Sequence, residues 1–227
     1  MDWSPVFISL KTASAAIVVT FVLGLLCARY IAFHPSRRLR LVMDGILTLP
    51  LVLPPTVVGY FLLLIFGVNH PIGHFLLETF GVTIVFHWWG TVIAAVVIAF
   101  PLMYRAARGA LEQVEEDLIH AGRTLGMSEN NIFWRVIVPS AKPGIVSGAV
   151  LAFARGLGEF GATIMLAGNI DGVTRTLPIS IYSDVAAGDG DQAMGSVIII
   201  CVISFMMVFA LNYYSVISNP KLKGQKQ

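Results

Sequence analysis

Residues 88–104 read WWGTVIAAVVIAFPLMY and close a charge-free run that begins at residue 79. A helix needs about 20 predominantly apolar residues to cross a bilayer, so a helix built from this run is long enough to span one. Apolar stretches with at most two charges recur along the chain, at residues 12–28, 45–77, 143–170 and 192–220. The pattern predicts an all-α integral membrane protein.

The composition supports the same class. The chain has 227 residues, of which 15 are Lys or Arg and 13 are Asp or Glu. Charged residues make up 12% of the chain, about half of the roughly 25% that is typical of soluble domains. Apolar residues reach 56% and the mean hydropathy is +0.80, which is more apolar surface than a soluble domain of this size buries. Intrinsic disorder is excluded too, and a net charge of +2 is too small to indicate nucleic acid.

Five stretches have the length and apolarity of a membrane span. We expect helices near residues 10–32, 44–66, 88–108, 144–168 and 194–216. Together they should form a single transmembrane domain over residues 1–227, with a core from about 8 to 218. Pro50, Pro54 and Pro55 interrupt the second span. Broken helices of this kind line cavities or hinges in transporters, or are plain structural kinks, and both readings stay open.

The cations predict the orientation. In a five-span arrangement, 12 of the 15 Lys and Arg residues fall on one side, within residues 29–40, 105–142 and 221–226. By the positive-inside rule this side is cytoplasmic, which places the N-terminus outside and the C-terminus in the cytoplasm. The N-terminus lacks the basic region of a secretory signal, so the first helix is expected to remain uncleaved.

The link at residues 108–142 is long and polar for so apolar a chain. Apolar residues recur there at helical spacing, at Leu111, Val114, Leu118 and Leu125. Gly126 should end a first short helix, and Ser128 should cap a second that runs through Val138 and ends at Pro139. Such a pair of helices either lies on the lipid headgroups or docks a cytosolic partner.

Residues 120–126, which read HAGRTLG, resemble together with Pro139 the coupling loop of type I ABC importer permeases. That family has Glu-Ala-Ala, three residues, Gly, nine residues and Ile-x-Leu-Pro. This chain keeps the first Ala, the Gly and the Pro at that spacing. It departs with His120 for Glu, Gly122 for the second Ala, Val136 for Ile and Val138 for Leu. The resemblance implies a coupling helix that inserts into a groove of the ATP-hydrolysing subunit. The implied coupling residues are His120, Ala121, Gly122, Arg123, Thr124, Leu125, Gly126 and Pro139.

Two further stretches, LPLVLPPTVVGY at residues 49–60 and AFARGLGEFGATI at residues 152–164, are similar to molybdate permeases. The likeness runs from about residue 5 to 218, and sulfate permeases share it more loosely. It implies the type I ABC importer permease fold in the bacterial inner membrane. It also implies a homodimer, cytosolic ATPase subunits and a periplasmic molybdate-binding protein. The same machinery carrying sulfate, thiosulfate or tungstate is the nearer alternative.

Arg155 and Glu159 lie four residues apart within the fourth predicted span, where an unpaired charge is costly. They form either a self-satisfied structural pair or part of an anion pathway, in which Arg155 attracts the oxyanion and Glu159 limits how tightly it is held. The candidate pathway residues are Arg155, Glu159, Thr163, Pro54 and Pro55.

The chain has no Gly-x4-Gly-Lys-Ser/Thr loop, so ATP and Mg²⁺ are expected on a partner chain and no cofactor on this one. It has no hydrolase motif and no predicted catalytic residue, and is not expected to be an enzyme. His70 and His74 are spaced like metal ligands but lack a third ligand, so no metal site is predicted. An ATPase-independent channel or a membrane scaffold remains the more distant alternative.

Overall fold

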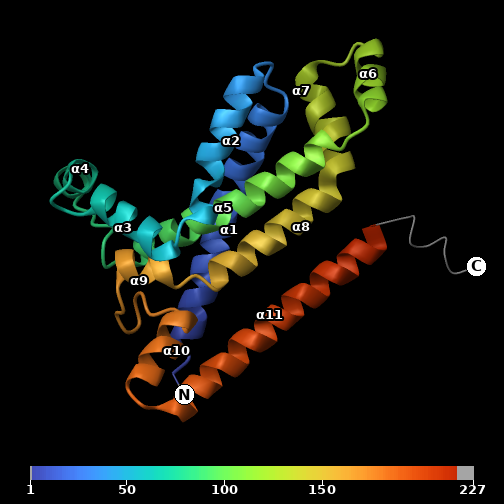
Figure 1. The fold of residues 1–227 in the computed structure, drawn as a ribbon. Helices are drawn as coiled ribbons and strands as arrows, with labels where there is room; N and C mark the ends of the chain where they lie inside the picture. The colour runs from blue at the N-terminus through green and yellow to red at the C-terminus, as the bar shows by residue number, and fades with distance from the viewer. Residues whose placement is uncertain (1, 219–227) are drawn as a thin grey trace, which may run out of the picture.

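A computed structural model describes residues 2–218, and its secondary structure in this range is helical, without a strand (Figure 1). Most of the chain lies in helices longer than nine residues, and the rest of the secondary structure consists of short helices. In chain order the elements are α1 (Ser4–Ala32), α2 (Arg37–Val52), α3 (Pro55–Phe66), α4 (Pro71–Phe80), α5 (Trp88–Glu112), α6 (Glu116–Thr124), α7 (Glu129–Ile132), the π-helical turn η1 (Phe133–Ile137), α8 (Val138–Leu157), α9 (Gly161–Ala167), α10 (Leu177–Ala186) and α11 (Gly190–Ser218).

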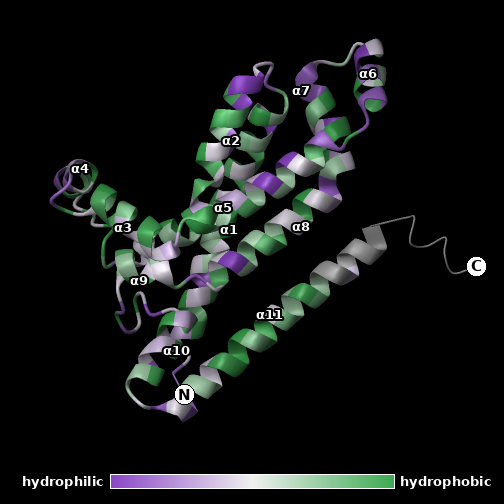
Figure 2. Ribbon diagram, in the orientation of Figure 1, coloured by the Kyte–Doolittle hydropathy of each residue, from purple (hydrophilic) through white to green (hydrophobic). Residues whose placement is uncertain are grey.

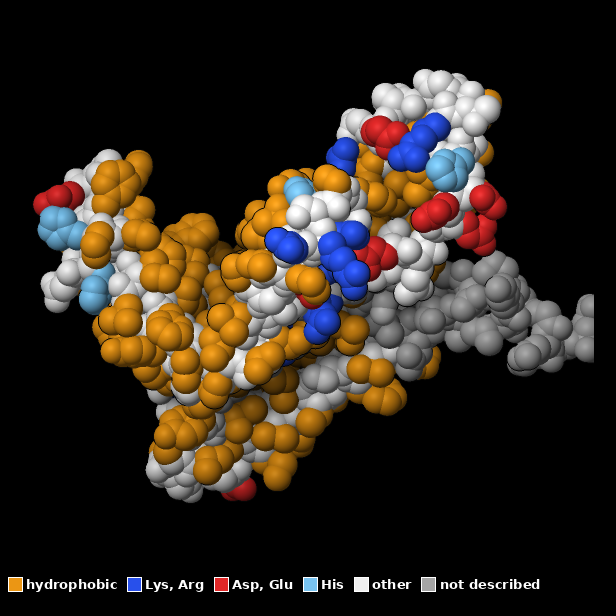
Figure 3. Space-filling view, turned by 45° about the horizontal axis from the view of Figure 1, so that its top comes forward, with side chains coloured by type: hydrophobic (Ala, Val, Ile, Leu, Met, Phe, Trp, Pro, Cys, Tyr) orange, Lys and Arg blue, Asp and Glu red, His pale blue; other side chains and the backbone are white. Residues whose placement is uncertain are grey.

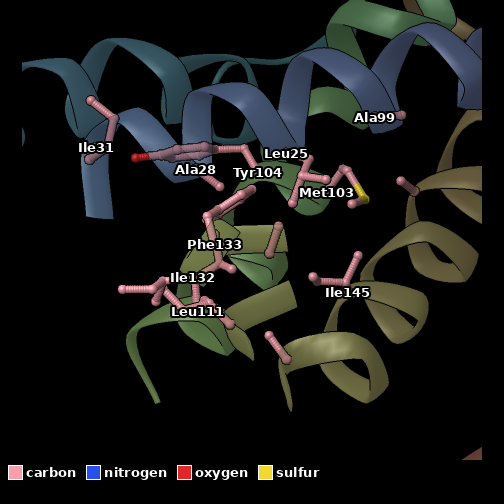
Figure 4. Packing of buried hydrophobic residues seen from close by; sticks show 14 residues of the cluster. Leu25, Ala28, Ile31, Ala99, Met103, Tyr104, Leu111, Ile132, Phe133 and Ile145 are labelled. Carbon is pink, nitrogen blue, oxygen red and sulfur yellow. The ribbon is translucent and has the colours of Figure 1, made fainter. Parts of the chain in front are cut away.

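Helix α5 is central, because α1 and α8 both pack along it. Small side chains let the backbones approach closely. A Cβ atom added at Gly144 or Gly148 of α8 would lie only 2.6 or 2.5 Å from the Cβ atom of Ala110 or Ala106. Figure 4 shows the large buried side chains of this core, with Tyr104 and Met103 of α5 lying between α1 and the segment that contains Phe133.

The second predicted span is broken. Helices α2 and α3 meet at an angle of 110° across Leu53 and Pro54. Pro55 occupies the first turn of α3, where its missing N–H costs no hydrogen bond. Helix α3 packs on α9, and Gly59 allows this contact, because a Cβ atom there would lie 2.8 Å from the Cα atom of Ala162.

Within residues 2–218, four helices are long and apolar enough to cross a membrane, or five when α2 and α3 count as one bent span. The helices predicted near residues 10–32, 88–108 and 194–216 are present as α1, α5 and α11, and each has the length and apolarity of a membrane span. Figure 2 shows hydrophilic residues concentrated at α6, α7 and the start of α2, whereas α1, α5 and α11 are largely hydrophobic.

The fourth predicted span, near residues 144–168, has other bounds in the structure, where the candidate span is Glu129–Leu157. Helix α8 starts earlier and ends at Leu157, and a new helix, α9, begins at Gly161. At the break, the Glu159 N–H bonds to the Gly156 carbonyl, three residues back, in place of the helical partner four residues back, and the Glu159 carboxylate accepts a hydrogen bond from the Ala162 N–H. The predicted basic cluster at residues 221–226 lies outside the described residues.

Candidate functional site

Helices α6 and α7, with the turn between them, form a surface element that we call the knob (residues 116–132). Gly126 turns the chain at the end of α6 with a left-handed φ of +73°. The N–H of Met127 donates to the Gly122 carbonyl at 3.1 Å, and the N–H of Gly126 donates to the Arg123 carbonyl at 2.9 Å. These two bonds make a Schellman motif, which satisfies the last carbonyls of α6. The predicted glycine stop is confirmed.

A cap and an ion pair close the knob on the other side of this turn. The Ser128 hydroxyl accepts a hydrogen bond from the Asn131 N–H and caps α7, as predicted. Arg123 donates to both carboxylate oxygens of Glu129, from Nε at 2.7 Å and from Nη2 at 3.2 Å. The hydrogen bond to Glu129 raises the pKa of Arg123, so its charge persists. Sequence analysis missed Glu129, although two opposite charges flanking a glycine turn were a readable signal.

The knob presents apolar side chains to its surroundings. Leu125 is 80% exposed and Leu118 is 43% exposed, whereas Leu111 is buried at the end of α5. Their helical spacing predicted one shared apolar helix face, and this prediction is wrong, because α5 ends at Glu112 and the chain changes direction before α6. His120, Ala121 and Thr124 are exposed as well.

Gly122 is the one buried residue of α6. A Cβ atom at this position would lie 3.1 Å from Cγ1 of Ile132, so the glycine lets α6 lie against the chain that follows it. The departure from the second Ala of the family pattern thus coincides with close packing inside the knob.

Pro139 does not end a helix, contrary to the prediction. Residues Glu129–Leu157 run as one continuous helix, with Pro139 at the first turn of α8. The π-helical turn η1 ends at Ile137, two residues before Pro139, and widens the helix there. The proline ring, which has no N–H, is accommodated here because the backbone hydrogen bonds already change from the π-helical to the α-helical pattern.

A cavity of about 670 Å³ separates the knob from the end of α1. His120 and Arg123 line it from α6, and Arg29 and His34 line it from α1 and the residues that follow. The Arg29 guanidinium lies 4.2 Å from the centre of the Phe133 ring and donates to the Asn130 side chain at 3.1 Å. Figure 3 shows Lys and Arg side chains gathered on this part of the molecule, on an otherwise mostly hydrophobic face.

The candidate pathway residues lie at the other end of α5 and α8, around the two helix breaks (Figure 1). Arg155 Nη1 lies 2.8 Å from Glu159 Oε2, and Glu159 Oε1 accepts from the Ala162 N–H at 2.8 Å. The Glu159 side chain is 1% exposed and that of Arg155 is 33% exposed. Both oxygens of the buried carboxylate therefore have partners.

The two breaks adjoin each other. A Cβ atom at Gly161 would lie 3.0 Å from Cβ of Pro55, at the first turn of α3. Thr163, two residues further along α9, is buried, and Pro54 is exposed at the bend. The structure thus brings Pro54, Pro55 and the start of α9 together, and the coupling candidates form a separate group.

No group of three or more His, Cys, Asp or Glu side chains in residues 2–218 could hold a metal ion. His74 instead lies 3.3 Å from the Glu78 carboxylate on exposed α4.

Proteins with similar sequences identify the family of this chain. The model of the family "Binding-protein-dependent transport system inner membrane component" matches residues 20–223. The molybdenum transport system permease protein ModB of Escherichia coli (strain K12) is 43% identical over 208 residues, which cover 91% of this chain and 88% of ModB. ModB of Haemophilus influenzae is 36% identical over 212 residues, which cover 93% of this chain and 92% of that protein.

Solved structures share the fold at low sequence identity. A bacterial ABC transporter involved in the import of the acidic polysaccharide alginate matches with a TM-score of 0.72 and 17% identity, covering 93% of this chain and 78% of that one. The inward-facing MetNI methionine ABC transporter matches with a TM-score of 0.66 and 19% identity, covering 92% and 94%. The chain therefore belongs to the family of binding-protein-dependent transport system inner membrane components, multi-pass proteins of the bacterial inner membrane.

Proposed function

We propose that this chain is the transmembrane subunit of an ATP-driven importer of molybdate. The observation that carries the proposal is identity of 43% and 36% to two molybdenum transport system permeases over nearly the whole chain. We propose a homodimer that works with two cytosolic ATPase subunits and a periplasmic molybdate-binding protein. Cofactor chemistry, namely ATP and Mg²⁺, belongs to the ATPase subunits in this proposal, and the chain itself is a transport subunit.

The knob is the proposed contact with the ATPase. Its rigid turn and its ion pair hold α6 in one orientation, and the exposed Leu118 and Leu125 offer apolar area for burial in a groove. Closure of the ATPases around ATP would draw the two knobs of the dimer together. Because α5 leads into α6 and α7 continues into α8, that movement would tilt the central helices and open the pore toward the periplasm.

The proposed path for the anion passes the junction of the two helix breaks. Pro54 and Pro55 at one break, and Arg155, Glu159 and Thr163 around the other, are the candidates. Helix breaks at membrane depth expose backbone groups that lipid does not satisfy, so they favour a wet lining. Glu159 already has two partners, so Arg155, one-third exposed, is the residue with capacity to attract an oxyanion.

The test is uptake of molybdate, tungstate and sulfate, measured by elemental mass spectrometry in host cells with and without this gene. Loss of molybdate accumulation at low external concentration, with sulfate uptake intact, is the expected result. Loss of sulfate uptake instead would indicate the same kind of transporter with sulfate as its substrate. Unchanged uptake of all three anions would contradict the proposal.

If the protein were an ATPase-independent channel, transport would continue after the knob is disrupted. We expect Gly126→Pro to abolish uptake while the protein still inserts in the membrane, because proline holds φ near −65° and removes the N–H that donates to Arg123. Uptake equal to wild type in this variant would favour the channel.

A further inference from the structure

Helix α2 is held in the molecule with little apolar burial. None of its 16 residues is fully buried, and Met43 and Leu47 are only partly buried against the core. Several of its large apolar side chains are exposed, among them Val52 at 82% and Leu41 at 66%. Hydrophobic packing within the chain therefore leaves the position of α2 weakly determined.

A polar network, rather than apolar packing, connects α2 to α5. Arg108 Nη1 lies 2.8 Å from Asp44 Oδ1, and Arg108 Nε lies 2.8 Å from Glu112 Oε1. The Tyr104 hydroxyl donates to Asp44 Oδ1 at 3.0 Å and accepts from Arg108 Nη1 at 3.3 Å. Tyr104 is fully buried, and the side chains of Arg108 and Asp44 are 21% and 28% exposed. Partial burial and multiple bonds make this network stronger than an ordinary surface ion pair.

The network lies between the two sites described above. Arg108 is in the last turns of α5, which ends at Glu112 and leads through three residues into α6 of the knob. Asp44 is in the middle of α2, whose far end is the 110° bend into α3. A displacement of the knob would therefore act first on the end of α5, where Arg108 and Tyr104 bond to Asp44 of α2.

We propose that the Asp44–Arg108–Tyr104 network is the contact that transmits movement of the knob to α2 and to the bend before α3. Asp44 and Arg108 are thus positioning residues for transport, which act through their contact with each other. The consequence for uptake rests on the proposed function, whereas the mechanical link between knob and bend is a property of this chain alone.

The first test measures the mechanical link directly. The native cysteines, Cys27 and Cys201, are first replaced by Ser. Spin labels are then attached at Leu125→Cys in the knob and at Val52→Cys at the bend, which are both strongly exposed positions. Pulsed EPR measures the distance between the two labels in the purified, full-length protein. Asp44→Asn keeps the shape of the side chain and removes its charge. We expect Asp44→Asn to broaden or shift the distance distribution, and Asp44→Glu to restore it. Identical distributions in wild type and Asp44→Asn would overturn the proposal.

The second test measures coupling in proteoliposomes that contain the complete transporter. We expect Asp44→Asn to lower molybdate uptake per ATP hydrolysed by about fivefold or more, a typical size for energetic coupling between sites. The matched control is Asp171→Asn, which breaks another Asp–Arg ion pair, between Asp171 and Arg175. This variant should leave the ratio of molybdate uptake to ATP hydrolysis unchanged. If uptake and ATP hydrolysis fell in proportion in Asp44→Asn, the network would stabilise the structure without transmitting movement, and the proposal would be contradicted. If wild type takes up no molybdate, the proposed function fails, and the EPR distances still decide the link.

Discussion

At the scale of single residues, Gly126 has a role that depends on backbone conformation rather than on space. A Cβ atom at this position would meet no atom within 4 Å, yet the φ of +73° is one that L-residues with side chains adopt at a cost. That cost is about 1–2 kcal/mol. The residue is therefore selected by the turn it makes, and a substitution tests the turn without creating a clash.

Gly126→Ala should weaken the knob without affecting the core. We expect less of the ATPase subunit to copurify with this variant, and lower uptake, at unchanged protein level. Gly109→Ala is the matched control, since its Cβ atom also meets nothing but its backbone is helical, where Ala is favoured. If Gly126→Ala retained wild-type ATPase binding and uptake, the left-handed turn would be irrelevant to docking.

The pair of Arg155 and Glu159 gives a second prediction at this scale. Arg155→Ala leaves the buried Glu159 carboxylate with only the Ala162 N–H as a partner, which should destabilise the protein by up to about 3 kcal/mol. We expect a lower amount of protein in the membrane, measured by immunoblot. Adding Glu159→Gln removes the unpaired charge and keeps an acceptor for Ala162, so the double variant should recover much of that amount.

The same variants separate structure from transport. Normal accumulation of Arg155→Ala would contradict the structural prediction, and normal accumulation together with poor uptake would place Arg155 on the anion pathway. Recovery of protein without recovery of uptake in the double variant would show that Arg155 serves both purposes.

At the scale of helices, the crossing of α5 and α8 is set by small residues. Gly144 and Gly148 lie against Ala110 and Ala106, and nothing larger fits between the two backbones. Three further glycines, Gly156, Gly158 and Gly161, lie close together in the sequence near the break between α8 and α9. Only Gly161 makes a contact near 3 Å, with α3, because helical spacing identifies which glycines share a face but not which partner lies opposite.

Gly148→Ala should force α5 and α8 apart. Its Cβ atom would lie 2.5 Å from Cβ of Ala106, and overpacking of this kind costs about 1–3 kcal/mol. We expect a lower melting temperature in detergent, and Ala106→Gly in the same chain should restore it by exchanging the two side chains across the interface. Gly45→Ala, whose Cβ atom meets nothing, is the control. An unchanged melting temperature in Gly148→Ala would mean that the crossing is not close-packed.

At the scale of the whole molecule, apolar length predicted three of the spans and proline content predicted the break of the second. The break after Leu157 was not predictable from apolarity, because the residues on both sides are equally apolar and the helix ends through bonds made by Glu159 and Gly158. Likewise, the turn at Gly126 follows from local sequence, whereas the exposure of Leu125 depends on the direction in which α6 leaves α5. The network of Asp44 and Arg108 joins residues far apart in sequence, which spacing rules do not reach.

The orientation of the molecule is the prediction on which the mechanism depends. The knob reaches an ATPase only if it is cytoplasmic. The loop between α9 and α10, which contains Gly172, must then be periplasmic, because α9 and α10 lie toward the opposite end of the bundle from α6 and α7 (Figure 1). The distribution of Lys and Arg predicts this arrangement. Alkaline phosphatase, which is active only outside the cytoplasm, should be active when fused after Gly172 and inactive when fused after Gly126. Green fluorescent protein fused at the same two positions should give the opposite pattern, which controls for expression. If phosphatase is active after Gly126, the knob faces the periplasm, and both its contact with an ATPase and the proposed direction of transport are wrong.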